Sequence, residues 1–250
     1  MNEKKMYTAL KGIIVLLFAG CTVLCNAQIL DEYPKNQEFY EGGSVNFYKE
    51  AHEYLVSNNL KECDAGEIYQ PRIIVTEEKG IKFIKDTDTA NIAKNKCAYD
   101  LSRLLIQNLK NWKPAEVNKR KIGAVTEFIF YPKDIMSNYK PGYNASHFVK
   151  YAQYPEGVKK FKNLFHDNFM MIFQDYAVQG NINLEFYIDK NGQIANPRIY
   201  PEIDNRSFNI DFMRTLARMK KPWKPALYGE IPIKERISFP LNFSVIYTEY

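Results

Sequence analysis

Hydrophobic and polar positions follow their clearest pattern in the second half of the chain. Apolar residues recur at helical spacing over residues 158–169, which predicts an amphipathic helix. Residues 180–189 then alternate apolar and polar side chains with the period of a strand that buries one face. Asn191-Gly192 predicts a type I′ hairpin, because both positions tolerate positive φ, so residues 194–200 should return antiparallel.

A second helix and a final strand complete this half. The helix is expected to start near Ser207, a candidate N-cap, and Pro222 ends it. Residues 237–247 alternate cleanly and predict a strand of the same sheet. Pro240 cannot donate to a strand ladder, so this strand is expected at a sheet edge. The order predicts an α+β fold, with two helices packed on a small three-stranded antiparallel sheet.

The first half follows the same order with a weaker pattern. Helices are expected around residues 45–55 and 94–109, with strands around residues 72–75, 81–84 and 124–131. Lys79-Gly80 is the expected hairpin turn. The segment after Tyr131 is polar and lacks periodicity, so we interpret it as a linker.

The tetrapeptide Trp-Lys-Pro-Ala occurs at residues 112–115 and again at residues 223–226. Neighbouring residues match at the same spacing, among them Asp100 with Asp211 and Arg103 with Arg214. We interpret the two halves as tandem copies of one module, at residues 38–132 and 154–250, joined by a linker at residues 133–153. Because burial of tryptophan favours a structural role, we expect Trp112, Pro114, Trp223 and Pro225 to close the two cores.

The amino terminus has a different character. Three lysines precede an apolar run over residues 12–25, and Cys25-Asn26-Ala27 offers small residues where a signal peptidase reads them. We therefore expect residues 1–27 to be a secretory signal peptide, which sends the protein to the periplasm or outside the cell. The run falls short of the ~20 residues that span a bilayer. Two alternatives stay open, an envelope lipoprotein with lipid on Cys21 and an uncleaved N-terminus.

Composition narrows the classes of function. With 46% hydrophobic and 25% charged residues, the chain is globular and long enough for two domains. Cleavage after Ala27 removes three lysines and one glutamate, which lowers the formal net charge from +5 to about +3. Such a balance excludes nucleic acid as a partner, since that needs a concentrated basic surface. Cleavage also leaves one cysteine pair, Cys63 and Cys97, for which a disulfide and burial as free thiols are both open.

No constellation for catalysis stands out. His52 and His166 are expected at the border of helix faces, and no Cys/His spacing typical of zinc appears. Cys63 lacks the glycine-rich oxyanion turn that would accompany a thiol nucleophile. Phosphate-binding loops and Gly-x-Ser-x-Gly elbows are absent from the sequence. We therefore expect a protein that is not an enzyme and that has no cofactor and no metal site.

Several motifs of the second half occur together and in a fixed order. They are Tyr154-Pro155, the alternating strand from Gly180, Asp189-Lys190-Asn191-Gly192, Lys221-Pro222-Trp223-Lys224-Pro225-Ala226, Gly229, Ile231-Pro232 and Phe239-Pro240-Leu241-Asn242-Phe243. In these motifs the second half resembles the C-terminal domain of the TonB family, and the first half looks like a diverged copy.

This resemblance implies a periplasmic domain that adds an extended segment of an outer-membrane receptor, or of another envelope protein, to a sheet edge. We expect the last strand to be that edge, with Arg236, Ser238, Asn242, Phe243, Ser244 and Val245 as the partner-binding residues. The alternative is an energy transducer between an inner-membrane motor and outer-membrane transport. Membrane attachment would come only from lipid on Cys21 or an uncleaved N-terminus, and pairing of two copies at the edge stays open.

Overall fold

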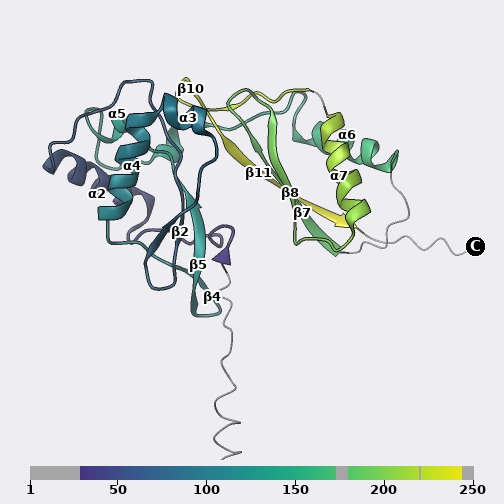
Figure 1. Ribbon diagram of the computed structural model, residues 1–250, viewed down its shortest axis with the longest axis horizontal. Helices are drawn as coiled ribbons and strands as arrows, with labels where there is room; N and C mark the ends of the chain where they lie inside the picture. The colour runs from purple at the N-terminus through teal and green to yellow at the C-terminus, as the bar shows by residue number, and fades with distance from the viewer. Residues whose placement is uncertain (1–28, 173–179, 220, 244–250) are drawn as a thin grey trace, which may run out of the picture.

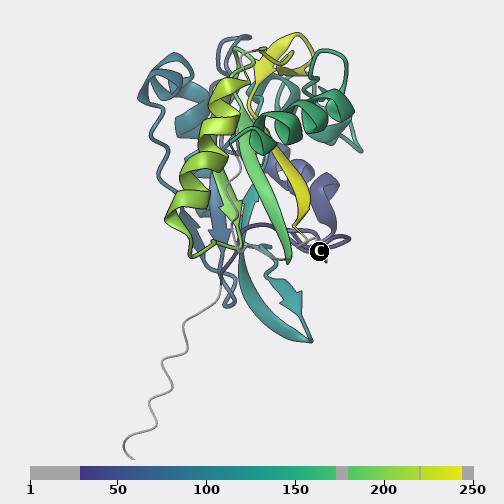
Figure 2. The same cartoon turned by 90° about the vertical axis from the view of Figure 1, so that its right-hand side faces the viewer.

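The chain folds as an α+β protein in four layers. The computed structural model describes residues 29–172, 180–219 and 221–243, so the expected signal peptide lies outside the described residues. Two sheets face each other in the middle of the molecule, and each carries its helices on its outer side (Figures 1 and 2). Among the described residues, no helix combines the length and apolar character needed to cross a bilayer.

The first region is a five-stranded sheet covered by two principal helices. Its strands follow the order β1-β5-β2-β3, with β4 paired to the start of β5. β1 is parallel to β5, and the other pairs are antiparallel. The bounds are β1 Ile29–Leu30, α2 Gly43–Ser57, β2 Arg72–Val75, β3 Ile81–Phe83, α3 Thr89–Lys94, α4 Lys96–Asn108, β4 Ala115–Val117 and β5 Arg120–Glu127.

The second region matches the expected helix, strand, strand, helix, strand order. Its antiparallel sheet has the order β11-β7-β8. The bounds are α6 Val158–Met170, β7 Gly180–Ile188, β8 Ile194–Tyr200, α7 Arg206–Arg218 and β11 Glu235–Phe243. α6 buries Phe161, Phe165 and Phe169 at a spacing of one helical turn, as its pattern predicts. The cap of α7 differs from the prediction, because Asn205 rather than Ser207 accepts the N–H of Phe208, at 3.0 Å.

A small third sheet fastens the second half of the chain to the first region. It has the order β10-β9-β6 and contains β6 Val149–Lys150, β9 Ala226–Tyr228 and β10 Ile231–Ile233. Ala226, Tyr228 and Ile233 belong to the core of the first region. After Trp223 the chain therefore returns to the first region before it enters β11.

The segment that we interpreted as a linker is packed structure. It contains α5 (Pro132–Ile135), the 3-10 helix η1 (Ala145–Phe148) and β6. Ile135, Tyr143 and Ala145 are buried in the first core. Periodicity did not predict the structure of this polar segment, because its few apolar side chains contact the core one at a time and do not form a periodic stripe.

The two tryptophans occupy equivalent, buried positions. Trp112 packs against Tyr40 and Phe47, with ring centroids 5.3 and 5.7 Å away. Trp223 packs against Tyr154 and Phe161 at 5.3 and 5.1 Å. The hairpins that follow have the same register, since Ala115 opposes Ile122 in one and Ala226 opposes Ile233 in the other. We call this shared tryptophan packing and hairpin register the frame of the two halves. Their origin by duplication stays a prediction.

The β7–β8 hairpin forms as predicted, but its turn type was wrong. Among the turn residues 189–193 only Gly192 has positive φ, at 79°, and the Asp189 N–H bonds to the Gln193 carbonyl at 2.9 Å. This is a longer turn with one left-handed residue. In the first region Lys79, and not Gly80, takes the left-handed position, with φ of 66°.

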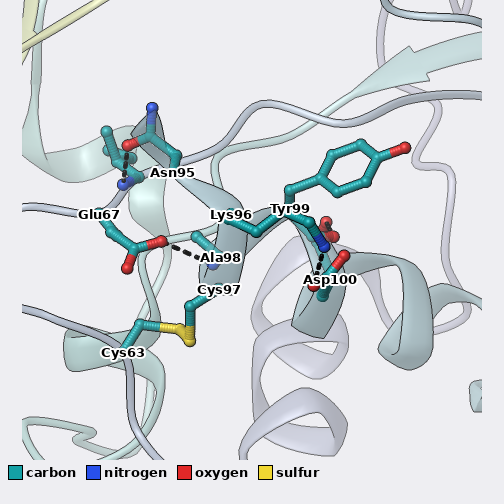
Figure 3. Close-up of a disulfide and its surroundings, with 10 residues drawn as sticks. Cys63, Glu67, Asn95, Lys96, Cys97, Ala98, Tyr99 and Asp100 are labelled. Atoms are coloured by element: carbon teal, nitrogen blue, oxygen red, sulfur yellow. Dashed lines mark hydrogen bonds and ion pairs between the residues drawn. A yellow bond between two sulfur atoms is a disulfide. The ribbon is translucent and has the colours of Figure 1, made fainter. Parts of the chain in front are cut away.

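The structure joins Cys63 to Cys97, which pins the loop before β2 to the start of α4 (Figure 3). Beside the bridge, the Glu67 carboxylate accepts the Ala98 N–H at 3.1 Å, and Asn95 Oδ1 accepts the Ile68 N–H at 3.1 Å. The loop is therefore held both covalently and by two side-chain hydrogen bonds near the start of α4.

Candidate partner-binding site

β11 lies at the edge of its sheet, as Pro240 predicts. Its nine residues pair with β7, from Glu235 opposite Ile188 to Phe243 opposite Gly180, and within the described part of the chain no strand pairs on its other side. Pro240 lies opposite Asn183. The strand chosen from the sequence is thus a long edge strand of the kind that can accept another strand.

The start of this edge is already occupied by a side chain of the first region. The Gln70 amide donates to the Lys234 carbonyl at 2.7 Å and accepts the Lys234 N–H at 3.0 Å. A side-chain amide therefore makes the two bonds that a neighbouring strand would make. Because backbone groups of alternate residues point the same way along a strand, Arg236, Ser238 and Pro240 also turn theirs away from β7.

The structure describes only some of the six predicted partner-binding residues completely. Ser238 is exposed and lines a cleft beside β11. Arg236 was predicted to contact a partner at the edge. Its side chain instead contacts Glu185 on β7 and Glu32. Asn242 and Phe243 end β11, and their side chains lie outside the described residues, as do Ser244 and Val245 entirely.

A network of charged side chains covers the face of the second sheet that is turned toward the first. Arg198 Nε donates to Glu185 at 2.6 Å, and Arg236 Nη2 donates to the other Glu185 oxygen at 2.7 Å. Nη1 of Arg198 reaches Asp31 at 3.2 Å, and Nη1 of Arg236 reaches Glu32 at 2.9 Å. Burial lowers the pKa of Arg198, but its bonds to Asp31 and Glu185 outweigh this and raise the pKa.

Sequence reasoning missed most of this network. The alternation of β7 places Glu185 on its polar face, which was a usable signal. Arg198 lies opposite Glu185 on β8, and that pairing depends on a hairpin register known only from the structure. Asp31 and Glu32 follow the expected signal peptide closely, where nothing in the pattern assigns them to the second half.

The cleft between the sheets has a volume of about 480 Å³. One wall is formed by residues 125–129, at the end of β5 and just after it, and another by residues 234–236 and Ser238, at the start of β11. Tyr187 lies between them, with its hydroxyl 3.5 Å from Glu127 and its ring below the Arg72 guanidinium. Burial raises the pKa of Glu127, an effect that the Arg72 and Lys234 charges partly offset.

Two further groups of residues were singled out from the sequence, the four of the Trp-Lys-Pro-Ala motifs for a structural role and the histidines and cysteines as candidates for chemistry. Trp112, Pro114 and Trp223 are buried, and Pro225 is half-buried. His52 bonds the Ile135 carbonyl through Nδ1 at 2.8 Å and stacks on Tyr139. Cys63, Glu67 and Cys97 lie close enough to share a metal ion, but the disulfide uses both sulfurs. His166 is exposed beside Asp167.

Comparisons of the chain with protein-family models, with curated proteins and with solved structures find no match.

Proposed function

We propose that this protein is a non-enzymatic component of the cell envelope that binds an extended segment of a partner by strand addition. The partner is an envelope protein or a peptide of an outer-membrane receptor, and the added strand pairs with the outer edge of β11. The protein reaches the periplasm by its signal peptide, and lipid on Cys21 is the alternative form of attachment. This proposal combines the resemblance to the TonB C-terminal domain with the geometry of β11.

The observation that carries the proposal is the one-sided pairing of β11. Nine residues pair with β7, and the outward backbone groups of Arg236, Ser238 and Pro240 lie beyond the point where Gln70 stops. An extended peptide can satisfy such groups whatever its sequence, while neighbouring side chains set the preference. The equivalent strand β5 supports this use of an edge, because β1 of the same chain adds to it in parallel.

Site-specific crosslinking in the envelope tests the proposal. A photoreactive amino acid at Ser238 lies on the strand that forms the proposed binding edge, and one at Tyr200 on the opposite edge strand β8 is the matched control, since both positions are exposed. We expect a defined envelope protein to crosslink at Ser238 and not at Tyr200, through a single extended segment. Equal crosslinking at both positions, or none at Ser238, would reject strand addition at β11. Crosslinks between two copies would identify the partner as the protein itself.

A TonB-type energy transducer is the second candidate, because the motifs of the second half resemble that family. Transduction needs attachment to the inner membrane, which the mature N-terminus decides. Mass spectrometry of the protein purified from the envelope should find Gln28 as the first residue, or Cys21 carrying lipid. An intact Met1 in the inner membrane would favour the transducer.

A further inference from the structure

Two arginines, Arg198 and Arg236, lie on the face of the second sheet that is turned toward the first sheet. We call their guanidinium groups the forks, because the nitrogens of each contact two different partners. Each arginine uses one part of its guanidinium to hold Glu185 and presents Nη1 away from it. Arg236, Glu185 and Arg198 come from three neighbouring strands, β11, β7 and β8. The side chain of Glu185 is only 7% exposed, so this anchor fixes the direction of both forks.

The outward parts of the forks bind two consecutive residues of the same chain. Nη1 of Arg198 bonds the Asp31 carboxylate, and Nη1 of Arg236 bonds the Glu32 carboxylate and contacts the Asp31 carbonyl at 3.4 Å. These two acids directly follow β1. The forks therefore contact an extended segment that presents two adjacent carboxylates.

The two acidic residues and the arginine pair with its anchor Glu185 differ in how far they are buried. The side chains of Asp31 and Glu32 are 36% and 70% exposed, and ion pairs at such exposed positions contribute little to stability. β1 adds only two residues of pairing. By contrast, Glu185 is buried, and a buried carboxylate that loses a charged partner is strongly destabilised. Glu185 therefore holds the two arginines, while the acidic side chains of residues 31 and 32 are held only at their exposed ends. The following residue, Tyr33, is fixed by its hydroxyl, which donates to the Lys113 carbonyl at 2.7 Å.

From this contrast we infer that Arg198 and Arg236 form a recognition site for extended peptides with two adjacent acidic residues, and that residues 29–32 are its resident, exchangeable ligand. The cleft beside Arg236 and Ser238 gives an incoming peptide room to follow the sheet. Lys234 and Arg72 line the same cleft together with Glu127 and Glu235, so the preference for an acidic occupant comes from Arg198 and Arg236. The site lies on the sheet face, so this inference does not depend on strand addition at the β11 edge.

A labelled peptide with the sequence of residues 29–34, Ile-Leu-Asp-Glu-Tyr-Pro, is the probe. Wild-type protein should bind it weakly, because a tethered segment competes at an effective concentration on the order of millimolar. In Asp31→Asn/Glu32→Gln the forks lose their own ligand, so the apparent affinity should rise at least about tenfold. The peptide Ile-Leu-Asn-Gln-Tyr-Pro should not bind this variant.

Lysine substitutions test the forks while they keep a positive charge beside the buried Glu185. Arg198→Lys and Arg236→Lys keep a cation beside the buried carboxylate but lose the second donor group. In the Asp31→Asn/Glu32→Gln background, each should weaken binding of the acidic peptide at least about tenfold, while Arg218→Lys, an exposed position at the end of α7, should not. Thermal unfolding confirms that each variant is folded.

Three results would overturn the inference. They are equal binding of the acidic and neutral peptides, no gain of affinity in Asp31→Asn/Glu32→Gln, and unchanged binding in folded Arg198→Lys and Arg236→Lys. Loss of the Ser238 crosslink would leave these peptide measurements untouched, so the two proposals fail separately.

Discussion

In the first region β5 pairs with β1 on the side away from β2, whereas in the second region β11 pairs with β7 alone among the described residues. The hairpins that lead into these strands have the same register, so Ala124 and Glu235 occupy equivalent positions. One region has covered its edge with its own chain, and the other has left it open. The two regions thus share the frame but differ at this sheet edge. The unpaired edge of β11 favours the second region as the binding part.

Loss of either tryptophan should have the largest effect and tests whether the frame is equivalent in the two regions. Replacing a buried tryptophan with alanine costs about 3–5 kcal/mol. Trp112 and Trp223 are 1% and 3% exposed, so Trp112→Ala and Trp223→Ala should lower the free energy of unfolding by similar amounts in urea titrations.

Phenylalanine substitutions refine this comparison. Nε1 of Trp112 donates to the Leu109 carbonyl at 3.0 Å, whereas Nε1 of Trp223 has no partner among the described residues. Trp112→Phe should therefore cost about 1 kcal/mol more than Trp223→Phe. The reverse order would show that the two sites differ in a way that their packing does not reveal.

The disulfide should give the next largest effect, and only in the first region. Cys63→Ser/Cys97→Ser opens a loop between positions separated by 34 residues, which should cost about 3 kcal/mol. Hydrogen exchange should accelerate in α4 and stay unchanged in β7. Treatment of the wild-type protein with reductant is the matched control, and equal acceleration in both elements would mean that the regions unfold as one unit.

The hairpin turns should respond in opposite ways. A Cβ on Gly192 would lie 1.9 Å from the Trp223 carbonyl oxygen at a positive φ, so Gly192→Ala should cost more than about 1 kcal/mol. Lys79→Gly should change stability by less than about 1 kcal/mol, because relief of the left-handed backbone and the entropy of glycine offset each other. Thermal melts of both variants measure the difference, and a tolerated alanine at Gly192 would contradict the close approach to Trp223.

The smallest effect concerns Glu235, which stands where β5 has Ala124. Burial raises the pKa of Glu235 above 4.5, although the Ala152 N–H that it accepts partly offsets this. The native state then binds a proton more tightly than the unfolded chain. The contribution of Glu235 to stability is therefore full below pH 4.5 and is lost as the pH rises through the raised pKa.

Glu235→Gln keeps an acceptor for Ala152 and removes the charge. Compared with wild type, its stability should decline less between pH 4.5 and neutrality in urea titrations at several pH values. Glu230→Gln, at an exposed glutamate on the neighbouring hairpin, is the control and should follow the wild-type profile. Identical profiles for all three proteins would contradict the raised pKa.

The sequence predicted what local periodicity determines. The spacing of Phe161, Phe165 and Phe169 indicated α6, and Pro240 placed β11 at an edge. It could not predict contacts that join distant segments through single side chains. Gln70 bonds Lys234, and Asp31 bonds Arg198, yet neither pair has a periodic signal, because each depends on how the two sheets face each other. The candidate strand was therefore predictable, while the charged face beside it was not.

The return of β9 and β10 to the first region has a consequence for the order in which the chain folds. The first region is synthesised before these strands, but Ala226, Tyr228 and Ile233 are part of its core. Tyr228 also bonds the Asp134 carboxylate at 2.6 Å and the Tyr143 hydroxyl at 2.7 Å. The interior of the first region therefore stays incomplete until residues 226–233 have been synthesised, close to the end of the chain.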